Sequence, residues 1–189
     1  MKSNPVLNII KSRRAVFPTQ YNSEVISKTE IETILEAANW APTHRRTEPW
    51  RFKVFYGASK LELGDFLAEK YQHTETKFSE FKQQKIIDKT RQASCVIAIC
   101  MQRDPNSLVP EWEEIAATAM AVQNMWLTAH SMEIGAYWSS PSLIEYLGEH
   151  IELAKGERCL GFFYMGKYDG ILPNGIRETP VSAKSTWIS

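Results

Sequence analysis

Residues Ala41 to Phe52 read APTHRRTEPWRF and hold the most specific pattern in this sequence. Pro42 and Pro49 restrict the backbone at both ends of a polar segment. Binding residues commonly lie on loops that a rigid scaffold positions, and a loop fixed in this way can hold polar groups over a flat ligand. The segment is therefore the first candidate for a binding site.

A helix is predicted to lead into this loop. Ser27 and Glu30 have the spacing of a capping box, and an apolar stripe follows them. The residues of that stripe are Ile31, Ile34, Leu35 and Ala38. Because a proline disfavours helical backbone at the preceding residue, Pro42 predicts that the helix ends near Trp40.

Three runs have the composition of core strands, namely Trp50 to Tyr56, Ser94 to Met101 and Leu160 to Met165. The second run is almost entirely apolar, which is typical of a strand covered on both faces. The cysteines lie at such runs without ligand-like spacing, so we interpret all of them as buried apolar side chains. They are Cys95, Cys100 and Cys159.

Other segments predict helices. Residues Ile115 to Met132 are apolar almost all round, so this helix should be buried on every side. Such a helix needs more cover than one small subunit supplies, which favours a dimer. The polar segment from His73 to Gln92 fits either a helix or a mobile loop. Ser140, Pro141 and Gly148 have the order of an N-cap, a first-turn proline and a C-terminal glycine, which predicts a short helix.

Composition narrows the class of protein. Lys plus Arg and Asp plus Glu number 22 each, so there is no basic excess for nucleic acid or an anionic membrane surface. No apolar stretch approaches the roughly 20 residues that span a bilayer. Residues 1–10 lack the features of a secretory signal, so a cytoplasmic location is expected. A chain of 189 residues is expected to form one domain over residues 1–189.

Common catalytic signatures are missing from the sequence. It contains no G-x-S-x-G, no P-loop, no H-E-x-x-H and no G-x-G-x-x-G that opens a helix. The histidines form no spaced ligand set, so no metal site is expected. They are His44, His73, His130 and His150.

Two segments carry alternative interpretations. Arg13 and Arg14 end a predicted short helix that begins near Val6, where cations interact favourably with the helix dipole. The same guanidinium groups also suit bidentate binding of a phosphate. In the segment Trp138–Pro141, Ser140 is either an N-cap or one of several hydroxyl and backbone N–H groups that meet a ring carbonyl or an anion.

The order of these segments resembles the nitroreductase-like flavoproteins. The matching motifs are SRR at 12–14, A-P-x(6)-P-W-R-F at 41–52, GAYWSS at 135–140 and GFFYMG at 161–166. The compact length and VPEWE at 109–113 are similar to the short single-domain NAD(P)H nitroreductases. The resemblance implies an α+β fold with a central, mostly antiparallel sheet wrapped by helices. It also implies an intertwined homodimer with two FMN sites at the interface.

The resemblance further implies the residues that bind FMN. Arg13, Arg14 and the adjacent Ala15 would meet the phosphate and ribityl chain, and a basic residue near the C-terminus, Arg177 or Lys167, would join them. The positions that would contact the flavin ring are His44, Glu48, Trp138, Ser139 and Ser140.

The implied activity is transfer of hydride from NADH or NADPH to flavin N5, followed by reduction of a small oxidant such as a nitroaromatic or a quinone. No catalytic side chain is required. The alternatives are a non-catalytic redox sensor, an FMN carrier, or a specialised reaction with residues 73–92 as a lid. Many relatives carry Asn and Gln where this chain has Arg46 and Glu48. Glu48 therefore faces a donor such as flavin N3–H or Arg46, or it pairs with Arg45 or Arg51 on the surface.

Overall fold

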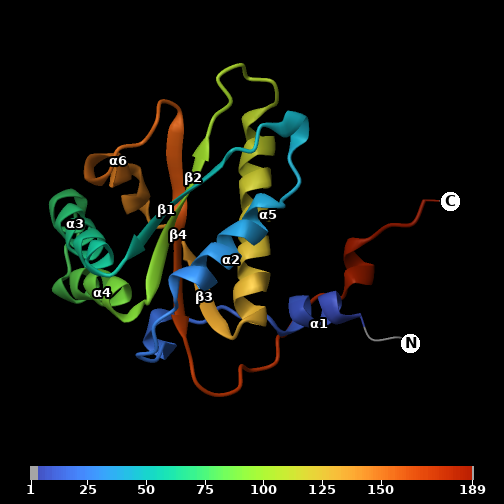
Figure 1. Ribbon diagram of the computed structural model, residues 1–189, viewed down its shortest axis with the longest axis horizontal. Coiled ribbons are helices and arrows are strands. Elements are labelled where there is room, and N and C mark those ends of the chain that lie inside the picture. The colour runs from blue at the N-terminus through green and yellow to red at the C-terminus, as the bar shows by residue number, and fades with distance from the viewer. Residues whose placement is uncertain (1–3, 189) are drawn as a thin grey trace.

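Four strands pair into one antiparallel sheet in the order β1-β2-β4-β3. The computed structural model describes residues 4–188 (Figure 1), so residues 1–3 and 189 of the predicted domain lie outside the described range. The strands are β1 (Trp50–Tyr56), β2 (Cys95–Gln102), β3 (Ile134–Ser139) and β4 (Glu157–Lys167). The predicted strands and the α+β class with an antiparallel sheet are confirmed.

Helices cover both faces of the sheet (Figure 1). The helices are α1 (Pro5–Ser12), which lies apart from the sheet, and α2 (Lys28–Asn39), α3 (Ala58–Thr74), α4 (Glu80–Gln92), α5 (Glu111–Ser131) and α6 (Leu147–His150), which cover it. Helices α2 and α5 share one apolar core with the sheet, and α3, α4 and α6 share the other. Alternate residues of β2 enter the two cores, with Ile97 in the first and Val96 in the second. This double burial explains the continuous apolar run, and Cys95, Cys100 and Cys159 are buried and free as predicted.

The capping box of α2 is confirmed. The Ser27 hydroxyl accepts from the Glu30 N–H at 3.3 Å, and the Glu30 carboxylate accepts from the Ser27 N–H at 2.8 Å. These bonds satisfy two backbone donors that the first helical turn leaves unpaired. The helix ends at Trp40, as Pro42 predicted.

The prediction that α5 is buried on every side is wrong for the single chain. Its buried residues form one stripe at helical spacing, which consists of Glu114, Ala117, Thr118, Ala121, Val122, Met125 and Ala129. On the other side Trp112 is 67 % exposed and Met120 is 41 % exposed. The sequence pattern cannot separate these two sides, because both are apolar.

Residues 73–92 do not form a mobile loop. His73 belongs to the end of α3, and α4 then packs along α3 from Glu80 onward. A Cβ at Gly64 would overlap the buried Thr90, so the glycine permits the close approach of these two helices.

The prediction for Ser140 and Gly148 is wrong in detail. A 3-10 turn occupies Ser142–Tyr146 and leads directly into α6, so Pro141 holds the N-cap position and Gly148 lies inside the helix. Ser140 makes no capping bond, because Pro141 continues the extended backbone for one more residue.

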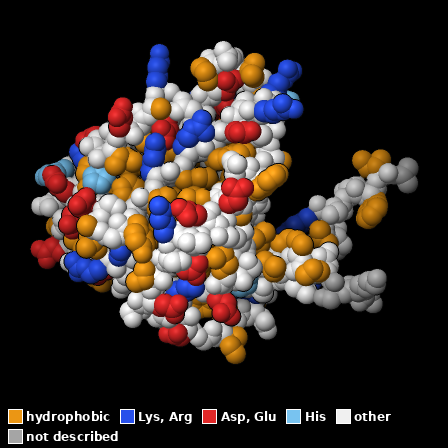
Figure 2. Space-filling model, in the orientation of Figure 1, with side chains coloured by type: hydrophobic (Ala, Val, Ile, Leu, Met, Phe, Trp, Pro, Cys, Tyr) orange, Lys and Arg blue, Asp and Glu red, His pale blue; other side chains and the backbone are white. Residues whose placement is uncertain are grey.

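The ends of the described chain project from the body of the molecule, and we call them the terminal arms (Figure 1). They comprise α1, which has no buried residue, and the tail 168–188. Figure 2 shows hydrophobic side chains gathered on these arms, and Ile171 and Trp187 are almost fully exposed. No helix within residues 4–188 is long and apolar enough to cross a membrane.

Candidate functional site

Arg13 caps the C-terminal end of α1 and lies over an aromatic ring. Its Cζ is 4.4 Å from the centre of the Trp126 ring, and its guanidinium makes no hydrogen bond or ion pair with another residue in 4–188. Partial burial, together with the positive charges of Arg14 and Arg177, lowers the pKa of Arg13. A negatively charged group beside Arg13 would offset the repulsion between Arg13 and the charges of Arg14 and Arg177.

Arg14 connects α1 with the tail. Its Nη1 donates to the carbonyl oxygens of Lys11 and Arg13, both at 2.7 Å, and its Nε donates to the Pro173 carbonyl at 2.8 Å. A Cβ at Gly175 would overlap the guanidinium, so the tail lies directly against it. Arg14 therefore serves the capping role that its position predicts. It also lines two cavities of about 460 and 280 Å³.

Two more basic residues lie beside this pair. The positive charge of Arg177 contributes to the lowered pKa of Arg13. Arg177 also lines the cavity of about 460 Å³ together with Arg14. The Nε2 of His130 is 2.8 Å from the Ser12 hydroxyl, and burial with the charges of Arg13 and Arg14 lowers the pKa of His130. We call Arg13, Arg14 and Arg177 the cationic cluster. No ion pair within residues 4–188 joins any of them to a carboxylate.

Lys167, the alternative to Arg177, is engaged elsewhere. Its Nζ is 2.7 Å from the Glu30 carboxylate, which also closes the capping box of α2. Of the two basic residues considered from the sequence, Arg177 is thus the one whose charge reaches Arg13.

The backbone that follows the cluster runs along β3. Ala15 is exposed, and the next residue, Val16, donates its N–H to the Ala136 carbonyl at 3.0 Å. Ser139 is three residues further along the strand, which corresponds to about 10 Å. One edge of the sheet therefore joins the cationic cluster to the segment Trp138–Ser140.

Trp138 turns toward the core that contains α5, and its indole N–H is buried without a partner in the described chain. A Cβ at Gly161 would overlap this ring, so the glycine makes room for it. The neighbouring Ser139 lines a cavity of about 340 Å³ on the opposite face of the sheet. Ser140 is exposed.

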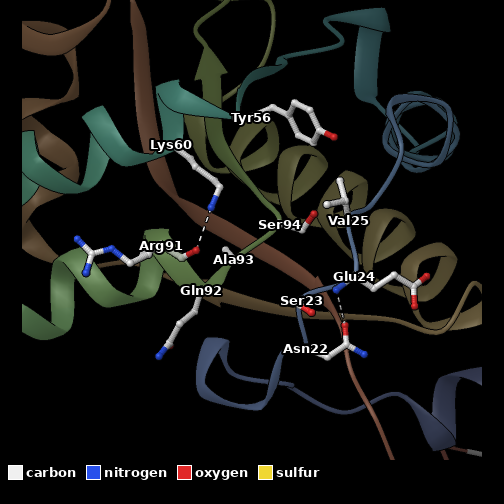
Figure 3. A pocket seen from close by; sticks show the side chains of 11 residues that line it. Asn22, Ser23, Glu24, Val25, Tyr56, Lys60, Arg91, Gln92, Ala93 and Ser94 are labelled. Atoms are coloured by element: carbon white, nitrogen blue, oxygen red, sulfur yellow. Dashed lines mark hydrogen bonds between the residues drawn. The ribbon is translucent and has the colours of Figure 1, made fainter.

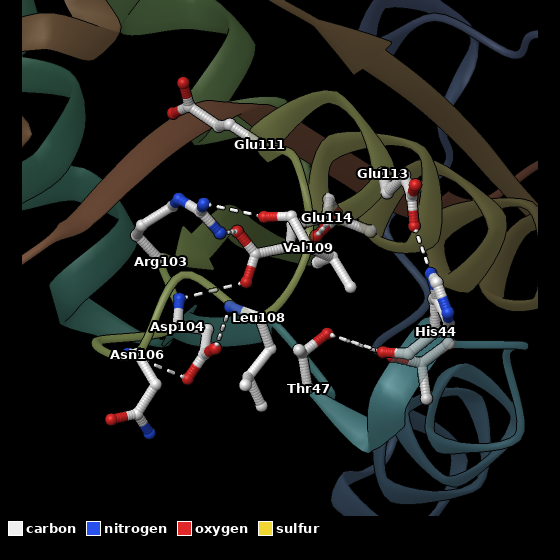
Figure 4. Close-up of polar contacts among 12 residues, drawn as sticks. His44, Thr47, Arg103, Asp104, Asn106, Leu108, Val109, Glu111, Glu113 and Glu114 are labelled. Carbon is white, nitrogen blue, oxygen red and sulfur yellow. Dashed lines mark hydrogen bonds and ion pairs between the residues drawn. The ribbon is translucent and has the colours of Figure 1, made fainter.

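The proline loop is held against the start of α5 (Figure 4). The Nδ1 of His44 is 2.6 Å from the Glu113 carboxylate, and the Thr43 hydroxyl accepts from the Glu48 N–H at 3.1 Å. Arg45, Arg46 and Glu48 have positive φ angles of 54°, 54° and 41°. Residues other than glycine rarely adopt positive φ angles, and backbone strain of this kind is concentrated at functional sites.

The Glu48 side chain is exposed, and its carboxylate pairs with no arginine within residues 4–188. Arg51 reaches this residue only through the backbone, by donating to the Glu48 carbonyl at 2.9 Å. The structure therefore shows neither the surface ion pair with Arg45 or Arg51 nor a pair with Arg46.

The proline loop and the cationic cluster lie at opposite ends of α5. His44 meets Glu113 in the first turn, and Ser12 meets His130 in the last. The rise of an α-helix places positions 113 and 130 about 25 Å apart. The structure thus gathers Arg13, Arg14, Ala15 and Arg177 near the edge of the sheet that carries Trp138–Ser140, but it leaves His44 at the opposite end of α5 from the cationic cluster.

Another cavity, of about 400 Å³, lies at the opposite end of β1 from the proline loop, near residues 22–25 (Figure 3). None of the predicted site residues lines it. Lys60 donates to the carbonyl oxygens of Thr90 and Arg91 at 3.1 and 3.0 Å, and partial burial lowers the pKa of Lys60. These contacts cap the C-terminal end of α4, which is a structural role.

The fold is an antiparallel sheet with helices on both faces, which defines an α+β protein. At the edge of the sheet lies a cationic cluster that has no acidic partner within residues 4–188, a candidate site for an anion. The family model "Nitroreductase family" matches residues 10–167. The chain therefore belongs to the nitroreductase family.

Relatives cover almost the whole chain. It is 28 % identical over 182 residues to "Putative NAD(P)H nitroreductase YfhC" of Bacillus subtilis, spanning 95 % of this chain and 92 % of that protein. The crystal structure of a nitroreductase-like family protein from Bacillus cereus matches with a TM-score of 0.82 and 28 % identity, over 100 % of this chain and 98 % of the other. A nitroreductase with bound FMN from Bacteroides fragilis matches with a TM-score of 0.70 at 21 % identity, over 99 % and 100 % of the two chains, which shows the shared fold.

Proposed function

We propose that this protein is an FMN-dependent oxidoreductase that passes electrons from NADH or NADPH to a small oxidant such as a nitroaromatic or a quinone. The observation that carries the proposal is the cationic cluster, which has no acidic partner within residues 4–188 and leads along β3 to Trp138–Ser140. Relatives named as NAD(P)H nitroreductases and a structural neighbour named with bound FMN support it.

The chemistry of the cluster fits a phosphate. The Arg13 guanidinium is partly buried, has no hydrogen-bond partner within residues 4–188 and lies near the positive charges of Arg14 and Arg177. A phosphate would offset this electrostatic repulsion. A hydrogen bond between charged groups contributes about 1.5–3 kcal/mol. Arg14 would contribute mainly by holding the tail, with Arg177 on it, beside the phosphate.

The β3 edge of the sheet suits the binding of a flat ring at its Ser139 end. Ser139, Ser140 and the backbone around them offer donors, and Ser139 lies about 10 Å along the strand from Ala136, which accepts from the Val16 N–H. When bound, FMN supplies the acceptor for hydride at N5 and the donor for the oxidant. The protein would hold the phosphate, orient the ring and exclude water from it.

The second wall of the ring site would come from another copy of this chain. Within one chain His44 lies at the opposite end of α5 from the cluster, and the helix sets this separation at about 25 Å. A homodimer would bring the proline loop of a second copy to the ring. The exposed apolar side of α5 and the terminal arms support this arrangement, since apolar patches of this kind mark interfaces.

Anaerobic spectroscopy tests the proposal. We expect the purified protein to be yellow, to release FMN on denaturation and to bleach when NADH or NADPH is added. A colourless protein that takes up no FMN in a fluorescence titration would refute flavin binding. A yellow protein that neither nucleotide bleaches would instead support the redox sensor or FMN carrier.

A further inference from the structure

The cavity of about 340 Å³ beside Ser139 has the size and walls of a small-molecule site. It lies between α3, α4 and the end of β3, on the face of the sheet opposite α5. Its apolar wall consists of Leu67, Tyr71, Ile86, Leu143 and Tyr164. These two phenol rings and three aliphatic side chains form an apolar surface that suits the flat ring of an aromatic ligand.

Three lysines from α4, Lys82, Lys85 and Lys89, line the rim of this cavity. They stand three and four residues apart, so they share one side of the helix, where like charges repel. None of the three forms an ion pair with a carboxylate of residues 4–188. The ammonium of Lys85 lies 4.9 Å from the Phe81 ring and that of Lys89 lies 5.9 Å from the Tyr137 ring. These aromatic contacts leave the positive charges of the lysines without a neutralising acidic partner.

The acid that lines the cavity does not neutralise these lysines. Glu75 directs its carboxylate to its own turn, where it accepts from the Lys77 N–H at 3.2 Å and the Thr76 hydroxyl at 3.5 Å. The hydroxyl of Ser139 has no hydrogen-bond partner in the described chain. The cavity thus combines an apolar wall, an excess of positive charge and a free hydroxyl.

We propose that this cavity binds the oxidant, and that the oxidant is an aromatic compound with a carboxylate or sulfonate group. The inference rests on the proposed function, because Ser139 belongs both to the cavity and to the segment expected to contact the flavin ring. The aromatic body packs against the apolar wall, and the ammonium groups draw the anion to the rim. For a nitroaromatic acid, one NAD(P)H gives two electrons and a proton as hydride, solvent gives a second proton, and the nitro group becomes a nitroso group with release of one water.

Steady-state kinetics with matched acceptors test this proposal. The FMN-loaded dimer is assayed with 4-nitrobenzoate and with its neutral methyl ester, as wild type and as Lys85→Gln/Lys89→Gln. A charge-matched control, Lys28→Gln/Lys155→Gln, removes two lysines that do not line the cavity. We expect the cavity variant to raise the KM for 4-nitrobenzoate by roughly tenfold, as the loss of a charge-assisted contact implies. The KM for the ester, and both values in the control, should stay unchanged.

Two results would overturn the assignment. Equal changes for acid and ester, or no change, would show that the lysines do not select an anion. A rise in the KM for NADPH or NADH alone would show that they meet nucleotide phosphates rather than the oxidant. Equilibrium dialysis of 4-nitrobenzoate against the FMN-loaded protein needs no turnover. Binding that the cavity variant loses and the control keeps would therefore support this ligand class even if NAD(P)H did not reduce the flavin.

Discussion

Arg13 is the residue on which cofactor affinity should depend most strongly. Arg13→Ala removes a guanidinium that has no acidic partner within residues 4–188 and is available to a phosphate. We expect FMN binding to weaken by about 1.5–3 kcal/mol in a fluorescence titration. Arg91→Ala removes an exposed arginine at the end of α4 and serves as the control. Equal FMN affinity in both variants would leave Arg13 as a helix-end cation.

Glu48 should set the redox potential rather than the affinity. In a dimer its exposed carboxylate would place a negative charge beside the pyrimidine edge of the flavin, where it disfavours the anionic reduced form. Glu48→Gln removes the charge while leaving a side chain of the same size at a positive φ. We expect the midpoint potential to rise by about 30 mV, equivalent to 1.4 kcal/mol for two electrons. Glu62→Gln on α3 is the matched control, and identical potentials in all three proteins would make Glu48 a surface charge.

At the level of single elements, the N-terminal end of α2 should respond to acid. The ammonium of Lys167 and the backbone N–H of Ser27 lower the pKa of Glu30 to about 2. Because this value lies below that of an unfolded glutamate, about 4.3, the stabilisation is complete above that pH and is lost as the pH falls toward 2. The pair is partly exposed, so we expect a contribution of about 1 kcal/mol.

Urea unfolding from pH 7 to 2.5 measures this contribution. Glu30→Gln keeps the side-chain acceptor of the capping box but lacks the charge. The wild type should exceed the variant in unfolding free energy at pH 7, and the two should converge as the pH falls below about 4. A constant difference across this range would show that the charge of Glu30 does not stabilise the helix.

Elements with local signals were predictable from the sequence. Ser27 with Glu30 fixed the start of α2, and the apolar run of β2 revealed a strand buried on both faces. The buried side of α5 was not predictable, because Met120 is as apolar as Met125 and only the surrounding chain decides which one is covered. The position of Ser140 was also wrong, since one extended proline moved the start of the helical turn by one residue.

The whole molecule is expected to be an obligate dimer. Met120 lies on the exposed apolar side of α5 with 41 % exposure, and Leu61 on α3 has nearly the same exposure, 42 %. Met120→Asp should therefore produce a monomer that loses FMN, because an unpaired charge at an apolar interface is costly. Leu61→Asp should remain a flavin-loaded dimer. Sedimentation with detection at the flavin absorbance checks both, and circular dichroism shows whether each variant is folded.

The site as a whole was less predictable than its parts. Arg13 and Trp138–Ser140 follow recognisable motifs, and the sheet edge joins them. Arg177 lies in a tail without periodic pattern, so only the structure reveals that it stands beside Arg13. The pairing of His44 with Glu113 likewise joins residues 69 positions apart, a contact that no local pattern encodes.

The contact between Arg14 and the Pro173 carbonyl has a consequence for the order of events during synthesis. These partners are 159 residues apart in the chain. At a translation rate of about 5–20 residues per second, roughly 8–30 s pass between the appearance of the guanidinium and that of its partner. Arg177 arrives later still. The growing polypeptide therefore carries Arg13 and Arg14 on the ribosome long before the walls around them exist, and nascent chains should not sequester FMN until the tail has been made.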